Sequence, residues 1–207
     1  LIADATVGDG DSLSATLTAA VAPTISNIET LNLTSFGGGL NFANVTGATA
    51  VNVTGTSFTA TGVANNSTFN LNNIFGAQSF TLATNSATDA ITLNLNNLNS
   101  GSSLSFADSA AGAIETINLA LANNATTTLT TLSANGSTVN VTGSGTLTLS
   151  HSGGHNATFN AAALSGALNY TQAAAANVSI AGSAGNDTFT FNATGTLTTA
   201  DTISGGA

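Results

Sequence analysis

The chain has 207 residues, of which 42% are hydrophobic, with 22 Gly, one Pro and no Cys, Met or Trp. Nine Asp and Glu are balanced by no Lys or Arg, which gives a formal net charge of −9. Binding to nucleic acids or to anionic lipid surfaces depends on Lys and Arg, so the composition excludes both, and no apolar run is long enough to insert into a membrane as a helix.

Apolar residues alternate with Thr, Asn or Ser along the chain, and the alternating runs recur about every ten residues with Gly, Asn and Ser between them. A period of two is typical of half-buried strands, and Thr and Val favour them. We therefore predict an all-β fold, with the Ala-rich segments 160–167 and 173–176 as the candidates for a helical turn. The runs are Leu31/Leu33, Val51/Val53, Phe69/Leu71, Phe80/Leu82, Ile91/Leu93/Leu95, Val139/Val141, Leu147/Leu149 and Phe189/Phe191.

Two short phrases occur twice in the same order. IETLNL at 28–33 returns as IETINL at 114–119, and VNVTG at 51–55 returns at 139–143. The offsets, 86 and 88 residues, are nearly equal, which favours a duplication. We predict a first β-repeat half at 1–113 and a second at 114–207, each with about four coils.

A parallel β-solenoid is the favoured architecture for such a chain. Coils of about 20 residues would stack with Phe, Leu, Ile and Val inward and with Thr and Asn on the outer faces. Stacked Asn and Thr would satisfy one another's hydrogen bonds, so the outer faces would need no charge. One or two antiparallel β-sandwiches are the alternative.

Residues 182–190, GSAGNDTFT, have a spacing suited to a hard cation. Gly182 and Gly185 permit a turn that directs backbone carbonyls inward, and Asp187 follows two residues later, before the hydrophobic Phe189. The segment resembles the nonapeptide of the repeats-in-toxin family, from which Ser183 departs at the second position. Ca²⁺ takes six to eight oxygen ligands, so neighbouring turns must complete such a site. A plain turn leading into a strand is the alternative.

The two ends of the chain extend this pattern. DTISGGA at 201–207 begins another turn of this kind, and LIADATVGDGD at 1–11 reads like the strand and acidic turn that follow one. We expect a module cut from a longer array, with calcium-binding turns near its joints. Asp4, Asp9 and Asp11 would cluster at one end, and Asp187 and Asp201 would lie at the other.

The chain as a whole resembles crystalline surface-layer proteins of Gram-negative bacteria that are exported by type I secretion. The resemblance rests on the glycine–aspartate turn, the phrase ISNIETLNLTS at 25–35, the Thr/Ala/Asn/Gly-rich composition and the absence of Lys. It implies an extracellular lattice or filament in which Ca²⁺ drives folding and assembly.

The predicted function is therefore a structural module at the cell surface that associates with copies of itself, with a cell-surface polysaccharide as a further candidate partner. The alternative is an adhesin, a biofilm-matrix segment or a solenoid that binds a glycan or ice. We do not expect an enzyme, because solenoids that cleave acidic polysaccharides commonly use Arg or Lys and this chain has neither.

The remaining titratable residues are predicted to have structural roles. His151 and His155 flank Ser-Gly-Gly, which indicates an exposed loop rather than a helical metal pair. Glu29 and Glu115 repeat with their surrounding phrase, which favours a cap on a coil turn or a cation ligand over a glycosidase pair. Two isolated acids beside Thr or Ser, Asp89 and Asp108, are predicted turn residues.

Overall fold

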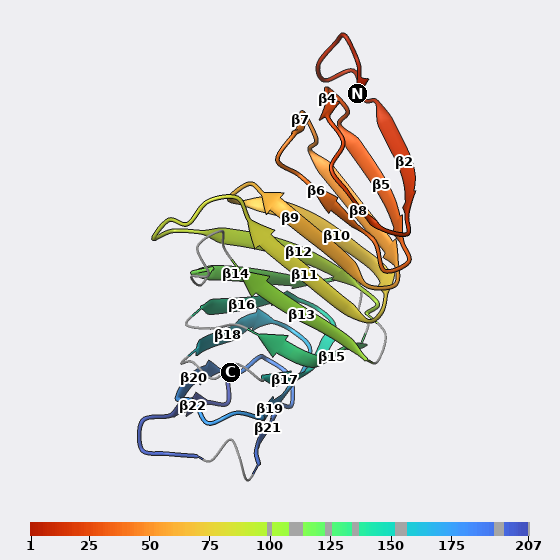
Figure 1. Ribbon diagram of the computed structural model, residues 1–207. Helices are drawn as coiled ribbons and strands as arrows, with labels where there is room; N and C mark the ends of the chain where they lie inside the picture. The colour runs from red at the N-terminus through yellow and green to blue at the C-terminus, as the bar shows by residue number, and fades with distance from the viewer. Residues whose placement is uncertain are drawn as a thin grey trace.

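In the computed structural model, the protein is a parallel β-solenoid (Figure 1). The structure describes residues 1–98, 101–107, 114–122, 126–133, 137–151, 157–192 and 197–206. Every strand pair in these ranges is parallel, so the predicted all-β solenoid is confirmed and the antiparallel sandwich is excluded. The described ranges contain no helix that could cross a membrane.

Two large sheets form the sides of the solenoid. The ten-stranded sheet contains β2 (Ser12–Leu17), β5 (Thr30–Ser35), β8 (Ala50–Gly55), β10 (Ser67–Ile74), β12 (Ala90–Asn96), β14 (Thr116–Leu121), β16 (Thr138–Gly143), β18 (Ala157–Leu164), β20 (Val178–Ala181) and β22 (Thr202–Ser204). The nine-stranded sheet contains β3 (Ala20–Val21), β6 (Gly39–Asn41), β9 (Phe58–Val63), β11 (Ala77–Leu82), β13 (Ser102–Ala107), β15 (Thr126–Ser133), β17 (Thr146–His151), β19 (Leu168–Gln172) and β21 (Thr188–Phe191).

A third, short sheet closes the first coils near the N-terminal end (Figure 1). It has three strands, β1 (Ile2–Ala3), β4 (Ile25–Ser26) and β7 (Val45–Thr46). Successive strands of the ten-stranded sheet pair in register over most of their length, with shifts between β8 and β10 and between β16 and β18. Paired residues are 18 positions apart from Ser12 to Thr30 and 26 positions apart from Ala90 to Thr116. The coils therefore vary in length around the predicted value, mainly in their turns.

Inward columns of apolar side chains form the core. The alternation places Leu31 and Leu33 of β5 inside, above Val51 and Val53 of β8, and the same arrangement continues along the stack. Five phenylalanines from neighbouring coils pack against one another in edge-to-face, tilted or stacked pairs. These are Phe42, Phe69, Phe58, Phe80 and Phe106, with ring centroids 5.0–6.5 Å apart along the run.

Asparagines on the outer face of the ten-stranded sheet form a ladder. The Asn52 Nδ2 donates to Asn32 Oδ1 at 2.9 Å, and the Asn70 Nδ2 donates to Asn52 Oδ1 at 2.8 Å. The Asn94 Nδ2 continues the ladder to Asn70 at 2.7 Å. This confirms the prediction that stacked amides satisfy one another, since each is both donor and acceptor.

The ladder changes column between β12 and β14. Asn94 lies opposite Ala120, and the next asparagine, Asn118, lies opposite Thr92 instead, to which its Nδ2 donates at 3.4 Å. Asn140 then donates to Asn118 at 3.0 Å. The ladder is therefore two separate columns, displaced by two residues on the same face.

The duplicated phrases occupy equivalent places in the stack. The first phrase enters β5 and β14, and the second forms β8 and β16, so each copy lies four coils from its partner in the ten-stranded sheet. Both large sheets continue across the predicted boundary at 113/114. The duplication itself stays a prediction. The Ala-rich segment 160–167 is not helical: it lies largely in β18, where Ala161 is buried and Ala162 and Ala163 are exposed, and 173–176 is not helical either.

Thr127 of β15 is a polar residue enclosed in the core. Its side chain is fully buried, and its Oγ1 has no hydrogen-bond partner. A buried hydroxyl without a partner costs about 1–3 kcal/mol. We predict that Thr127→Val raises the free energy of unfolding by about 1 kcal/mol, measured by chemical denaturation. Thr128→Val, on the half-buried neighbour, is the control for β-propensity; equal effects of the two substitutions would contradict the prediction.

Candidate functional site

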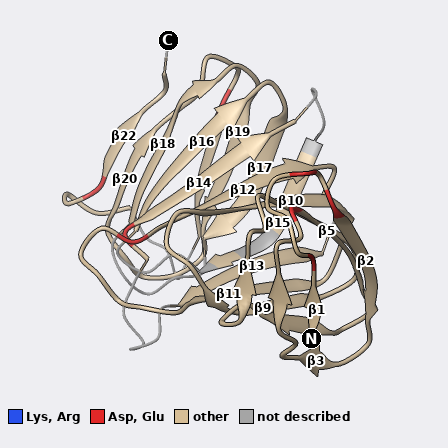
Figure 2. Cartoon of the chain, turned by 90° about the horizontal axis from the view of Figure 1, so that it is seen from above, with Lys and Arg blue, Asp and Glu red and all other residues tan. Residues whose placement is uncertain are grey.

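The loop between β1 and β2 brings three aspartates together. Asp4 directly follows β1 and Asp11 directly precedes β2, while Gly8 and Gly10, with φ of 80° and 97°, reverse the chain between them. Carboxylate oxygens of Asp4, Asp9 and Asp11 lie within 4.8 Å of one another. The predicted clustering of these three residues is therefore present in the fold. Figure 2 shows the acids in short, separated segments and shows no basic residue.

Hydrogen bonds and charge act differently on the three carboxyl groups. The Thr6 hydroxyl and backbone N–H both donate to Asp4 Oδ2 at 2.6 Å, which lowers the pKa of Asp4. The same hydroxyl contacts Asp9 Oδ2, but it has one proton and can donate to only one carboxylate at a time. The negative charge of Asp9 raises the pKa of Asp11. The cluster therefore concentrates negative charge that the chain does not neutralise.

Glu29 holds this loop from the next coil. Its Oε1 accepts from Gly8 N–H at 2.9 Å, and its Oε2 accepts from Asp11 N–H at 2.9 Å and Gly10 N–H at 3.3 Å. These bonds, that from Gly8 first, lower the pKa of Glu29. Its repeat counterpart Glu115 accepts from Asp89 N–H at 2.9 Å. The prediction of a capping role for both glutamates is confirmed.

Asp187 and Asp201 cap backbone groups in the same way. Asp187 accepts from Leu168 N–H at 2.8 Å through Oδ1 and from Ser183 N–H at 2.7 Å through Oδ2. Asp201 accepts from Val178 N–H at 2.8 Å, which, together with the N–H of Thr198, lowers its pKa. Each of these acids therefore binds the N–H group at the start of a strand one coil earlier.

The glycines of the 182–190 turn have a different role from the one predicted. Neither Gly182 nor Gly185 has a positive φ. A Cβ at Gly182 would lie 2.3 Å from Asp187 Oδ2, and one at Gly185 would lie 2.6 Å from the carbonyl oxygen of Gly166. The missing side chains make room for a carboxylate and for a neighbouring coil. The next turn stacks directly on this one, since Gly182 N–H donates to Ser204 O at 2.8 Å.

The acidic residues at the two ends of the chain are arranged differently. Within the described ranges, Asp4, Asp9 and Asp11 form the one group of three or more potential metal ligands, and neither Asp187 nor Asp201 joins such a group. Sequence reasoning identified the three aspartates that cluster at the N-terminal end. It missed the backbone N–H groups that engage the acids of later coils, because these come from residues 19–23 positions away.

The prediction that His151 lies in an exposed loop is wrong. His151 is the last residue of β17 and is fully buried, with its Nδ1 3.1 Å from Gln172 Oε1 and its ring packed against Phe159. The alternation Leu147, Leu149, His151 already placed it on the inner face.

Asp89 accepts from Ser86 N–H at 2.7 Å, as predicted for a turn residue. His155 and Asp108 lie outside the described residues.

Comparisons of the chain with protein-family models, with curated proteins and with solved structures found no match.

We predict that Glu29→Gln destabilises the protein at neutral pH and not at acid pH. A carboxyl group whose pKa is lowered by folding stabilises the native state above its unfolded pKa, and this contribution is lost as the pH falls through the folded pKa. Denaturation midpoints of both proteins in calcium-free buffer should therefore converge on acidification. Asp11→Asn is the control of opposite sign, because the pKa of Asp11 is raised. A midpoint difference between Glu29→Gln and the native chain that does not change with pH would contradict the assignment.

We also predict that Gly182→Ala destabilises the fold by about 1–3 kcal/mol, because the new Cβ meets the Asp187 carboxylate and the backbone of Gly205. Gly205→Ala is the matched control, since a Cβ there meets nothing within 4 Å. Thermal unfolding of the two variants should differ clearly. Equal loss in both would show that the close contact at Gly182 is not limiting.

Proposed function

We propose that this chain is a structural module of a secreted bacterial surface layer or extracellular filament, folded and assembled with calcium. Its partners are further copies of itself, and its role is mechanical rather than enzymatic. The uncharged outer face, with asparagines paired along the stack, suits a protein that must persist outside the cell. A fold of this kind is compatible with several other roles, so the acidic loop between β1 and β2 carries the proposal.

The observation that carries the proposal is the cluster of three carboxylates in a chain without Lys or Arg. Oxygen atoms within 4.8 Å of one another repel strongly when ionised, and the raised pKa of Asp11 expresses this repulsion. A cation from solution would remove it. Asp4, Asp9 and Asp11 offer up to six carboxylate oxygens, the donor type and number that Ca²⁺ prefers.

The residues around the cluster would prepare the site. Glu29 binds the three N–H groups of the loop, so the aspartate side chains are held together without using Glu29 as a ligand. The ion would supply positive charge, and its binding energy would add to the stability of the first coil. In a calcium-poor cytoplasm the repulsion between the aspartates would remain, and the hydrogen bonds to Glu29 alone would hold the loop.

The turn at 182–190 has a secondary place in this proposal. Both oxygens of Asp187 already accept hydrogen bonds, so an ion there would share them and would need carbonyls from the stacked turn at 204–206. We assign Gly182, Gly185, Asp187 and Asp201 to a second calcium-dependent joint because the turn at 204–206 stacks directly on this one. Since its acids are already capped, we expect weaker binding than at the aspartate cluster.

Ice binding has less support than the structural role. The T-x-T pairs of residues 59/61, 146/148 and 188/190 lie in β9, β17 and β21 of the nine-stranded sheet, with other strands between them. Ser79 and Ser105, at the register positions that follow Thr59, interrupt the array. A role as an adhesin, a biofilm-matrix segment or a glycan-binding module remains the second candidate, and one pocket favours it.

The test combines calorimetry with electron microscopy. We expect Ca²⁺ to bind the native chain more tightly than Mg²⁺, and Asp9→Asn to weaken calcium binding by about tenfold through loss of one charged ligand. Sheets or filaments should form in millimolar Ca²⁺ and dissolve when a calcium-selective chelator is added. Binding should weaken as the pH falls, because Asp11 takes up a proton.

Each outcome separates parts of the proposal. Assemblies that ignore the chelator would leave a polymer but remove calcium as its switch. Monomers under both conditions would refute the lattice and filament. Equal calcium affinity in the native chain and Asp9→Asn would refute the aspartate site.

A further inference from the structure

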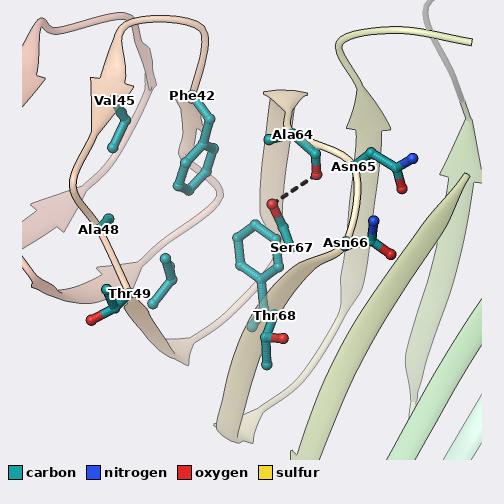
Figure 3. Close-up of a pocket in the computed structure, with 11 residues that line it drawn as sticks. Phe42, Val45, Ala48, Thr49, Ala64, Asn65, Asn66, Ser67 and Thr68 are labelled. Atoms are coloured by element: carbon teal, nitrogen blue, oxygen red, sulfur yellow. Dashed lines mark hydrogen bonds between the residues drawn. The ribbon is translucent and has the colours of Figure 1, made fainter.

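The solenoid has a step where its third side ends. β7 is the last strand of the three-stranded sheet, and the following coil turns sharply at 64–66 instead of adding a strand. Asn66 adopts a φ of 62°, and Ser67 closes the turn by donating its N–H and its hydroxyl to Ala64 O, the latter at 2.7 Å. The missing strand leaves a pocket of about 320 Å³ between the two coils (Figure 3).

The floor of this pocket is apolar and aromatic. Phe42 points into the gap from the coil that carries β7 (Figure 3) and is half-buried. Its ring packs at 86° against Phe69, with centroids 5.3 Å apart. Phe69 is fixed by the rest of the phenylalanine run, and Val45 and Val51 complete the floor. A rigid floor of this kind presents a fixed hydrophobic surface to a ligand.

The rim is polar and carries no ionisable side chain. Ser67 and Thr68 lie along it, whereas the side chains of Asn65 and Asn66 point away from Phe42 (Figure 3). The amide of Asn65 is engaged with a later coil, since its Oδ1 accepts from Ala90 N–H at 2.8 Å. The side chain of Thr68 forms no hydrogen bond to any described residue. The rim therefore offers hydroxyl groups beside an aromatic ring.

We propose that this pocket binds one ring of a neutral saccharide. The C–H face of a sugar ring would pack on Phe42, and its hydroxyls would bond to Ser67 and Thr68. An anionic ligand has no cation to meet here, because the chain has no Lys or Arg. A purely apolar ligand would leave the rim groups unpaired, which is costly. The volume, at the lower end of the usual range of about 300–1,000 Å³ for ligand sites, suits one ring with its substituents.

The proposal uses none of the acidic residues, so its test is independent of the calcium site. Its test is an amide-resolved NMR titration of the full chain with neutral disaccharides: maltose, cellobiose, lactose and chitobiose. We expect at least one to shift the amide signals of residues 42–51 and 64–69. Shifts confined to other regions, or none with any of the four sugars, would overturn the proposal.

Three variants sharpen the test. Thr68→Val removes a rim hydroxyl while it keeps the shape of the side chain, and should weaken binding by about tenfold. Thr158→Val, at an exposed position of β18 outside the pocket, is the matched control and should bind normally. Ala48→Leu fills the pocket and should abolish binding while circular dichroism stays native. Unchanged affinity in both Thr68→Val and Ala48→Leu would refute the site.

Discussion

In-register stacking of parallel coils is the constraint on which the structure depends. Each strand bonds to the next coil, so a side chain at an in-register position lies about 4.8 Å from the equivalent side chain above and below. The residue type at each column position must therefore be able to stack on copies of itself. Leucine, valine and phenylalanine do so inside, and asparagine does so outside because each amide donates to one neighbour and accepts from the other.

The same constraint accounts for the charge distribution. A repeated ionised residue would stack like charges, at a cost of about 1 kcal/mol per neighbour even in water. The described carboxylates lie in or beside turns, where Glu29, Glu115, Asp187 and Asp201 accept N–H groups from the preceding coil. These acids replace the backbone acceptors that an irregular turn fails to supply. The aspartate cluster before β2 is the exception, since its three carboxylates face one another.

Irregularities in the stack create its distinctive surfaces. The change of column at Ala120 divides the asparagine ladder, and the end of the three-stranded sheet at β7 opens the aromatic pocket. The first arises from residue identity within an in-register strand pair, because Ala120 takes the place of an asparagine, and the second arises where a coil omits the third strand. In a repetitive fold, departures from the repeat are therefore where specific binding is most readily built.

The sequence by itself determined the fold class and most of the inward residues, because a period of two is a local property, and it indicated that outward asparagines would stack on one another. It also indicated that Asp4, Asp9 and Asp11 would meet, since one short loop carries all three. Only the tertiary structure decided that Asp187 caps Leu168, that Gly182 provides space rather than a positive φ, and that the third side ends at β7. These contacts join residues a whole coil apart, and their positions depend on turn lengths that no local pattern specifies.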